Sequence, residues 1–399
     1  MSQRHVDVLV VGAGPAGLAL AARLAAGGDT RVEVLEREQE AGGVPRHCRR
    51  RGFDGPGFAR RYAEAAIRAG AALRTGVTAL GWCGPLALDT VGPAGLETVT
   101  ATAVVLATGA RERPRGARLV AGTRPAGVFT TGELQQAVHL YGQRIGQRAV
   151  VVGAEAVSYA AVDTLLDAGV DVVAMVTDLA RHQGNRLRAV NSRLGQRIPL
   201  LTRTTVIELW GRGRLSGVAL RHHDGLTASL ACDTVVFTGD FVPDHELARR
   251  GGLTLDTGTR GPAVDGAFRT SREGVFAVGN VLHAVESAAA VAREGVRAAR
   301  YVRDHLAGAP WSPTVPLLVA PPLRWAAPNR LAPAMPYGPF VLGAAEFLTR
   351  PVLAVTQDGR VLHRQRLLTT VVPNRPLRLD GRWVGSVDPA AGPVRVTAR

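Results

Sequence analysis

The chain has 399 residues, 46% hydrophobic and 20% charged, a composition typical of a globular protein with two or three domains. Its formal net charge is +15. Because the sequence contains no lysine, all 48 basic residues are arginines, which excludes a lysine Schiff base and a P-loop lysine. Three scattered cysteines, Cys48, Cys83 and Cys232, exclude a disulfide framework, an iron–sulfur cluster and a zinc cage, so we expect no metal.

Location and charged partners are constrained in the same way. No apolar run is long enough to span a membrane, and the first apolar strand begins within six residues of the start, so we expect a cytoplasmic protein without a signal peptide. The arginines are spread out and no basic–aromatic motif occurs, so we expect no nucleic acid. The charge reflects either a compositional bias or an acidic partner or anionic substrate.

The start of the chain predicts a βαβ dinucleotide-binding unit. An apolar strand, the glycine-rich turn Val11–Gly17, a helix and a second apolar strand ending in Glu36 follow one another. Gly12 permits the tight turn, Gly14 lets a pyrophosphate approach the backbone, and Gly17 allows close helix packing. N–H groups at the helix start face the phosphates, and Glu36 accepts from ribose hydroxyls. The alternative is a turn with a purely structural role.

The pattern then repeats. Residues from about 60 to 108 predict a helix and short strands that close on a segment containing Ala107-Thr108-Gly109. A helix starting at Thr130 leads into a second strand–helix–strand pattern over 149–176, an internal repeat of the first unit. A long helix is predicted over 286–306.

Residues 310–399 differ in composition. They are rich in proline, and their short apolar runs are separated by Asp358-Gly359 and Asp380-Gly381, two hairpin signals. They predict a small antiparallel β domain that offers little for chemistry. The apolar stretch 315–319 and Trp325 suit packing, either onto the chain's own core or against a partner.

Taken in order, these motifs resemble the pyridine nucleotide-disulfide oxidoreductase superfamily, the flavoproteins with two dinucleotide-binding domains. The resemblance covers about residues 5–306 and also rests on Gly42-Gly43 and on the segment 274–280, where Asn280 replaces the family's usual aspartate. It implies an α/β fold with two Rossmann-like domains, the second inserted in the first, plus the C-terminal β domain. The implied limits are 1–115 and 265–309 for the FAD-binding domain, 116–264 for an NAD(P)-binding-like domain, and 310–399 for the β domain.

The resemblance also implies non-covalent FAD in the first domain. The N-terminus of the helix that begins near Ala288 is in the family's place for stabilising the reduced flavin. The residues implied to hold FAD are Gly12, Gly14, Pro15, Ala16, Gly17, Glu36, Arg37, Gly43, Arg46, Thr108, Gly109, Gly279, Asn280 and Ala288.

Catalytic residues are less well indicated. The candidates are Cys48, His283 and Glu286. Each has a structural alternative: a buried small residue for Cys48, and a surface or capping role for the other two. A basic cluster beside Cys48 could hold an anionic substrate or the FAD phosphates; it consists of Arg46, His47, Arg49, Arg50 and Arg51.

Two departures from the family pattern affect the expected chemistry. Only Cys48 follows the Gly-Gly turn, and the second unit has no cysteine before Cys232, so disulfide reduction through a local dithiol is not expected. Glu155 replaces the second glycine of the second unit, and its repulsion of about 1–4 kcal/mol would weaken dinucleotide binding by roughly one to three decades. NAD(P) is therefore doubtful, although Asp178 with Arg181 leaves a possible ribose reader. The alternative is a nucleotide domain kept as scaffold.

The segment from Gly42 to Phe53 also resembles the subunits that pair with amine or amino-acid dehydrogenases, such as the alpha subunit of sarcosine oxidase and the matching subunits of hydrogen cyanide synthase and opine dehydrogenases. This implies an FAD-dependent oxidoreductase with a small amine or amino acid as substrate and a partner flavoprotein subunit. One alternative is an NAD(P)H-dependent reductase of an acidic electron carrier. Another is a non-catalytic nucleotide-binding subunit that organises a catalytic partner.

Overall fold

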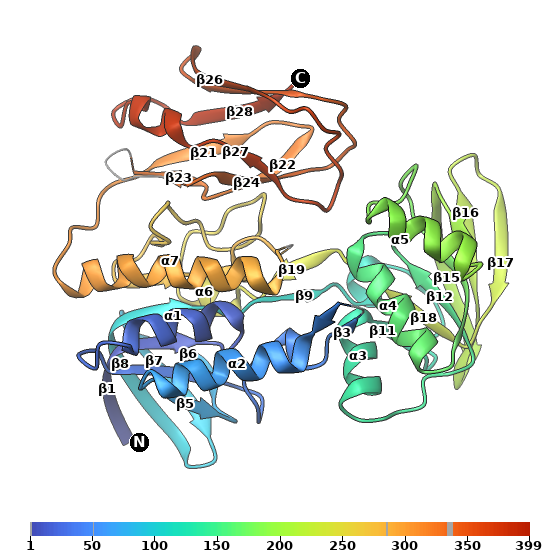
Figure 1. Ribbon diagram of the computed structural model, residues 1–399, viewed down its shortest axis with the longest axis horizontal. Helices are drawn as coiled ribbons and strands as arrows, with labels where there is room; N and C mark the ends of the chain where they lie inside the picture. The colour runs from blue at the N-terminus through green and yellow to red at the C-terminus, as the bar shows by residue number, and fades with distance from the viewer. Residues whose placement is uncertain (1, 51, 285, 333–337) are drawn as a thin grey trace. The chain divides into compact units, whose positions relative to one another are not determined.

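The computed structural model describes residues 2–50, 52–284, 286–332 and 338–399 (Figure 1). Arg51, one member of the predicted basic cluster, lies outside the described residues. The chain divides into two compact units. The first contains residues 1–43, 57–110 and 242–399, and the second contains residues 44–56 and 111–241.

The first unit is built on a seven-stranded sheet. The run Val8-Leu9-Val10 is fully buried, as expected for a parallel strand covered on both faces. The parallel strands continue into two antiparallel ones at one edge. In order across the sheet they are β5 (Ala72–Thr75), β2 (Val32–Glu36), β1 (Ser2–Val11), β8 (Gly95–Leu106), β7 (Ala87–Gly92) and β6 (Thr78–Gly84), with β20 (Val275–Ala277) also paired to β8.

Two helices of the first unit, α1 (Pro15–Ala25) and α7 (Ala288–Leu306), pack against each other. They approach closely because a Cβ on Gly295 of α7 would lie only 2.1 Å from the carbonyl oxygen of Ala16 in α1, so only glycine fits there. Other helical elements that lie at least partly in the first unit, before its C-terminal strands, are α2 (Gly55–Arg68), α6 (Glu246–Arg250) and the 3₁₀ turn η4 (Gly279–Val281).

The C-terminal strands form two further sheets and a core of their own, in which Phe340 stacks on Trp383 at 5.1 Å between ring centroids. The pairing is antiparallel, as predicted, except that β21 and β28 run parallel. The five-stranded sheet has the order β23 (Arg330–Leu331), β21 (Val315–Val319), β28 (Val394–Ala398), β25 (Val352–Gln357) and β26 (Arg360–Arg366); the other has β22 (Leu323–Ala327), β24 (Phe340–Ala344) and β27 (Leu377–Leu379).

The two predicted hairpin turns have different outcomes. Asp358-Gly359 joins β25 to β26, so the first prediction is confirmed. The second is wrong, because Asp380-Gly381 leads from β27 into the 3₁₀ helix η5 (Arg382–Ser386). The Asp380 carboxylate accepts from the backbone N–H of Arg382 and the Asp380 carbonyl accepts from the buried Trp383 indole, so the dipeptide starts a helical turn.

Several contacts fasten these strands to the rest of the first unit. Asn329 accepts from the backbone N–H of Val264 at 2.9 Å, and Arg269 donates to the carbonyl of Pro310 at 3.0 Å. A Cβ on Gly258 would lie 2.6 Å from the Arg324 carbonyl. This packing favours the interpretation that the C-terminal residues cover the chain's own core.

The second unit has its own five-stranded parallel sheet, as expected for a repeat of the nucleotide-binding unit. Thr130 begins α3 (Thr131–His139) with a capping box to Glu133, and α4 (Ala156–Asp167) follows the second glycine-rich turn. The sheet order is β11 (Val128–Thr130), β18 (Thr234–Phe237), β12 (Arg148–Val152), β13 (Asp171–Val176) and β14 (Leu200–Leu201).

Smaller elements complete the second unit and two of the four points where the chain passes between the units. At those points β9 (Ala110–Glu112) pairs with β19 (Phe241–Pro243). The other elements are a four-stranded sheet of β10 (Ala121–Gly122), β15 (Thr204–Arg212), β16 (Arg214–His222) and β17 (Thr227–Ala231), the pair β3 (Arg49–Arg50) and β4 (Phe53–Asp54), and the helices η1 (Val44–Arg46), η2 (Arg115–Arg118), α5 (Arg186–Val190) and η3 (Asn191–Gly195).

Replacing Leu342 with alanine tests the C-terminal core. Leu342 is fully buried, so we expect the free energy of unfolding to fall by about 2–5 kcal/mol through lost burial and an unfilled cavity. Leu368 is 80% exposed, and Leu368→Ala, the matched control, should change it by less than about 0.5 kcal/mol. Urea denaturation followed by tryptophan fluorescence measures both. Equal losses in the two variants would contradict the packing described.

Candidate functional site

The glycine-rich turn between β1 and α1 is tightly packed at Gly12 and Gly17 but open at Gly14. Gly12 has φ of 108°, and a Cβ on it would lie 2.4 Å from the carbonyl oxygen of Ala107. A Cβ on Gly17 would lie 2.1 Å from the Gly12 carbonyl oxygen. Around Gly14, the N-cap of α1, no atom lies within 4 Å of the Cβ position, and Pro15 occupies the first turn of the helix. The start of α1 therefore faces a space that an anionic group can enter.

Glu36 lies at the end of β2, where the sequence places the ribose reader. Its carboxylate is buried and accepts from the backbone N–H groups of Ala13 and Glu38, each at 3.0 Å. These bonds hold the carboxylate beside the turn. Arg37, also predicted at the cofactor, has a side chain that is 67% exposed and lies 3.7 Å from Asp244.

Other predicted cofactor residues of the first unit lie around the same turn. A Cβ on Gly43 would be 3.0 Å from the Cα of Gly14, and one on Gly279 would be 2.8 Å from the Cβ of Ala16. Gly109, just past β8, has φ of 75° and an open Cβ position, while Thr108 donates to the carbonyl of Asp244 at 2.6 Å. The turn is thus lined by backbone.

Asn280 fixes the loop in front of α7. Its side-chain oxygen accepts from the Glu286 N–H at 3.1 Å, and its side-chain nitrogen donates to the Glu286 carbonyl at 3.2 Å. Ser287 caps the helix that Ala288 begins. The Glu286 carboxylate is not directed to open solvent: it pairs with Arg378 at 3.2 Å.

His283 lies in a buried ion pair. Its Nε2 is 3.2 Å from the Glu294 carboxylate, and the Trp325 ring stacks over it at 5.8 Å. Burial disfavours the charged imidazole, but the facing Glu294 carboxylate outweighs it and raises the pKa of His283. The same pairing lowers the pKa of Glu294 against its own burial. His283 is therefore closed to solvent.

The segment with the basic cluster groups with the second unit. His47 is buried, and burial together with the Arg46 charge lowers its pKa to about 4, so the imidazole is neutral near pH 7. Arg46 is half-buried. Burial lowers the pKa of His139, and the nearby Arg49 charge lowers it further. Cys48 is half-buried. None of the three cysteines, all of which the structure describes, forms a disulfide.

The turn between β12 and α4 is filled by the chain itself. The Glu155 carboxylate is buried and accepts from the Ala154 N–H at 3.0 Å, and Thr238 lies 3.2 Å from its other oxygen. Burial raises the pKa of Glu155. A second carboxylate, Glu112, accepts from the N–H groups of Gly132 and Gly239, and burial raises its pKa to about 7. The residues of this turn therefore do not fit a dinucleotide pyrophosphate.

The sequence identifies Glu155 as a departure from the family pattern. Its motifs do not identify the hydrogen-bonding roles of Ser158 and Thr238, or the buried Glu112 carboxylate. The internal repeat could have revealed Thr238, because an alignment of the equivalent strands of the two units matches Thr238 with Ala107. Glu112 lies shortly after Ala107-Thr108-Gly109, and no sequence motif marks it as a functional residue.

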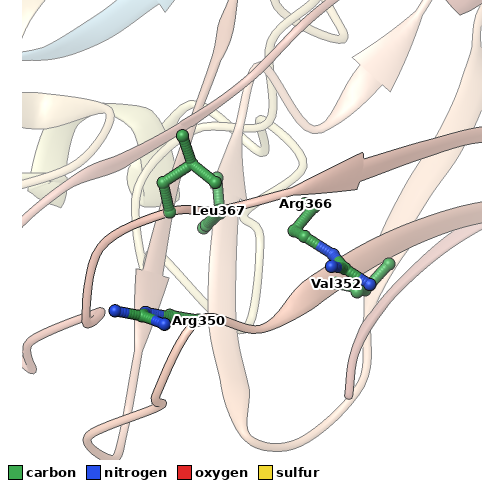
Figure 2. A pocket seen from close by; sticks show the side chains of 5 residues that line it. Arg350, Val352, Arg366 and Leu367 are labelled. Atoms are coloured by element: carbon green, nitrogen blue, oxygen red, sulfur yellow. The ribbon is translucent and has the colours of Figure 1, made fainter.

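A surface pocket of about 340 Å³ lies elsewhere, at the edge of the β25–β26 hairpin (Figure 2). It is lined by Arg350, Val352, Arg366, Leu367 and Leu368, none of which the sequence assigned to a site. Within the described ranges no group of three or more His, Cys, Asp or Glu side chains could hold a metal ion. No helix in the described part of the chain is long and apolar enough to cross a membrane.

The His283–Glu294 pair predicts a pH dependence of stability. Because the folded pKa of His283 is raised, its contribution is fully present below the unfolded value of 6.5 and is lost as pH rises through the folded pKa. We expect the stability difference between the protein and His283→Gln to be larger at about pH 6 than at about pH 9. Urea denaturation at both pH values measures it. A difference that does not change with pH would contradict the ion pair.

The sequence is similar to components of known oxidases. It is 31% identical over 281 residues to the alpha subunit of sarcosine oxidase from Corynebacterium sp. (strain P-1), covering 63% of this chain and 28% of that one. It is 27% identical over 311 residues to an opine oxidase subunit from Agrobacterium tumefaciens (strain Ach5), covering 69% and 61%. The chain therefore spans less than two thirds of the length of either relative.

Solved structures share the fold. Thioredoxin reductase from T. acidophilum has a TM-score of 0.64 at 23% identity, covering 76% of this chain and 99% of that one. An NAD-dependent persulfide reductase from A. fulgidus has a TM-score of 0.61 at 18% identity, covering 88% and 68%. The family described as pyridine nucleotide-disulphide oxidoreductase matches residues 6–295. The resemblance found from the motifs is confirmed, and the chain belongs to this family of flavin-dependent oxidoreductases.

Proposed function

We propose that the chain is an FAD-dependent oxidoreductase without a redox-active disulfide and a subunit of an amine or amino-acid dehydrogenase or oxidase. Proteins of its family generally bind FAD and NAD(P). The observation that carries the FAD assignment is the open Cβ position at Gly14, at the start of α1, beside the buried Glu36 carboxylate.

The two ends of this site, the start of α1 and the Glu36 carboxylate, suit different parts of FAD. The N–H groups at the start of α1 would hold the pyrophosphate, because a glycine N-cap leaves them uncovered. Glu36 would accept from the ribose hydroxyls. Gly279 and Asn280 would contact the ribityl chain of FAD, beyond the pyrophosphate. Bound FAD would supply reversible acceptance of two electrons.

The chain's own residues would position the cofactor and provide the electrostatic field around it. Asn280 holds the loop before α7 at both of its side-chain polar atoms, which fixes where the helix begins. Ser287 caps the Ala290 N–H, and the N-terminal end of α7 would stabilise negative charge on a nearby ring. Because Glu286 and His283 are both engaged in ion pairs, we assign neither to proton transfer with the substrate.

The substrate class and partner rest on the relatives. One is named a subunit of sarcosine oxidase and another a subunit of opine oxidase. Both names indicate oxidation of small amines or amino acids within an assembly of several chains. We therefore propose a small amine or amino acid as substrate and a partner flavoprotein subunit. The limits of the FAD-binding, inserted and β domains given from the sequence are part of this proposal.

One observation supports a second candidate, an NAD(P)H-dependent reductase of an acidic electron carrier: the net charge of +15 suits an acidic partner. The filled turn at Glu155 opposes it, because such a reductase must bind the nucleotide. A scaffold role without redox chemistry remains the third candidate.

Gly14→Glu should abolish FAD binding without unfolding the protein. The new carboxylate would enter the open space at the start of α1 and repel the pyrophosphate. Gly385→Glu is the matched control, since Gly385 is exposed and its Cβ position is also open. Flavin released on denaturation, measured per mole of folded protein, should be lost only in Gly14→Glu. Stoichiometric flavin in that variant would refute the site.

Anaerobic mixing separates the candidate functions. The purified protein, with any chain that copurifies, is mixed with NADH, NADPH, sarcosine, proline or an opine while the flavin absorbance near about 450 nm is followed. We expect bleaching by one of the amines and none by either nucleotide. Bleaching by a nucleotide supports the reductase. No bleaching by any compound supports the scaffold.

A further inference from the structure

The two glycine-rich turns of the chain have the same backbone. The N-cap of α1, Gly14, has φ and ψ of −77° and 179°, and the N-cap of α4, Glu155, has −88° and 178°. Gly12 and Gly153, two residues earlier, both have positive φ, 108° and 136°. The turns therefore differ in their side chains, and those side chains decide what each turn can accept.

Three positions change together between the repeats. Gly14 corresponds to Glu155 and Gly17 to Ser158. The third follows from strand register: Val11 pairs with Leu106 as Val152 pairs with Phe237, so Ala107 corresponds to Thr238. At each position the first unit has a small apolar residue and the second has a polar one.

The three polar side chains bond to one another. Ser158 Oγ accepts from the Glu155 N–H at 3.2 Å and lies 2.6 Å from Thr238 Oγ1. Thr238 Oγ1 lies 3.2 Å from one oxygen of the Glu155 carboxylate. Ser158 and Thr238 are buried with Glu155, so the replacements form one buried, hydrogen-bonded group, in which Thr238 Oγ1 also lies 2.9 Å from the Val152 carbonyl.

The Glu155 carboxylate also takes over a bond that a different residue makes in the first unit. There, Glu36 at the end of β2 accepts from the Ala13 N–H at 3.0 Å. In the second unit the equivalent N–H, of Ala154, donates to Glu155 itself at 3.0 Å. The carboxylate lies over the turn, because a Cβ on Gly239 would be only 1.8 Å from its Oε1 and one on Gly153 would be 3.0 Å from its Oε2.

Neighbouring groups close the turn further. Glu112 accepts from the Gly239 N–H at 3.0 Å, and Arg118 donates to the carbonyls of Thr238 and Gly239. On the other side, the Ala154 carbonyl accepts from the N–H groups of Gln183 and Gly184. The N–H groups of Ala154, Glu155 and Gly239 beside the turn are thus already bonded within the unit.

We infer that the second unit does not bind a pyridine dinucleotide, because Glu155, held by Ser158 and Thr238, occupies the place of the pyrophosphate. The exclusion is steric as well as electrostatic, so it holds whether the carboxyl is charged or neutral. Combined with the proposed function, it follows that NAD(P)H does not reduce this protein and that its electrons come from another donor, the amine or the partner subunit.

Reversing the replacements tests the inference. The full chain, Glu155→Gln, Glu155→Gly and the triple variant Glu155→Gly/Ser158→Gly/Thr238→Ala are titrated with NADH and with NADPH by equilibrium dialysis, which needs no flavin and no activity. We expect no saturable binding up to about 1 mM for the full chain and for Glu155→Gln, which keeps the volume of the side chain. The triple variant should bind at least one nucleotide roughly tenfold or more tightly.

Two controls keep the outcome clear. Circular dichroism and thermal melting verify folding, and Ser158→Gly/Thr238→Ala, which keeps Glu155, should not gain binding. Binding by the unaltered chain below about 100 µM would overturn the inference whatever the variants do. A folded triple variant that gains nothing would also overturn it. Flavin content is measured separately, so a protein without FAD would refute the proposed function and leave this test intact.

Discussion

Close backbone approach at the carboxyl ends of the parallel strands is the constraint on which the first unit depends. The start of α1 lies against β1 and β8 so tightly that Gly12 and Gly17 have no room for a Cβ, and Gly295 brings α7 against the same turn. This approach leaves the Cβ position of Gly14 open, beside main-chain groups whose positions the sheet fixes. A side chain at Gly12 or Gly17 would move the helix away from the strand.

The second unit meets the same constraint with side chains in place of open space. Gly153 still makes the turn, but a Cβ there would lie 2.0 Å from Thr238 Oγ1 and 2.7 Å from Ser158 Oγ. The Thr238 hydroxyl reaches one oxygen of the buried Glu155 carboxylate, and the Ser158 hydroxyl bonds to Thr238. A single glutamate without such partners would be a buried polar group without hydrogen bonds, which is costly. The coordinated change explains how the turn keeps its backbone.

Much of this arrangement could be predicted from the sequence because it depends on local signals. The glycine spacing, the acid at Glu36 and the capping box at Thr130 act within a few residues, and the structure has the turn, the strand end and the helix start where they were expected. The parallel pairing of β21 with β28 joins strands far apart in the chain, which no local pattern encodes. The burial of His283 likewise depends on Trp325 and Glu294, which tertiary packing brings to it.

The two turns also differ in what completes them. The first N–H groups of any helix need an acceptor from outside the helix. Just before α4, Glu155 and Ser158 accept from the N–H groups of Ala154 and Glu155, whereas at α1 the N-cap is a glycine and Pro15 removes only one of the donors. We propose that an external anion completes the first turn, whereas the chain's own side chains occupy the second. A ligand that binds only the folded state stabilises it by mass action, so under this proposal the stability of the first unit depends on its ligand.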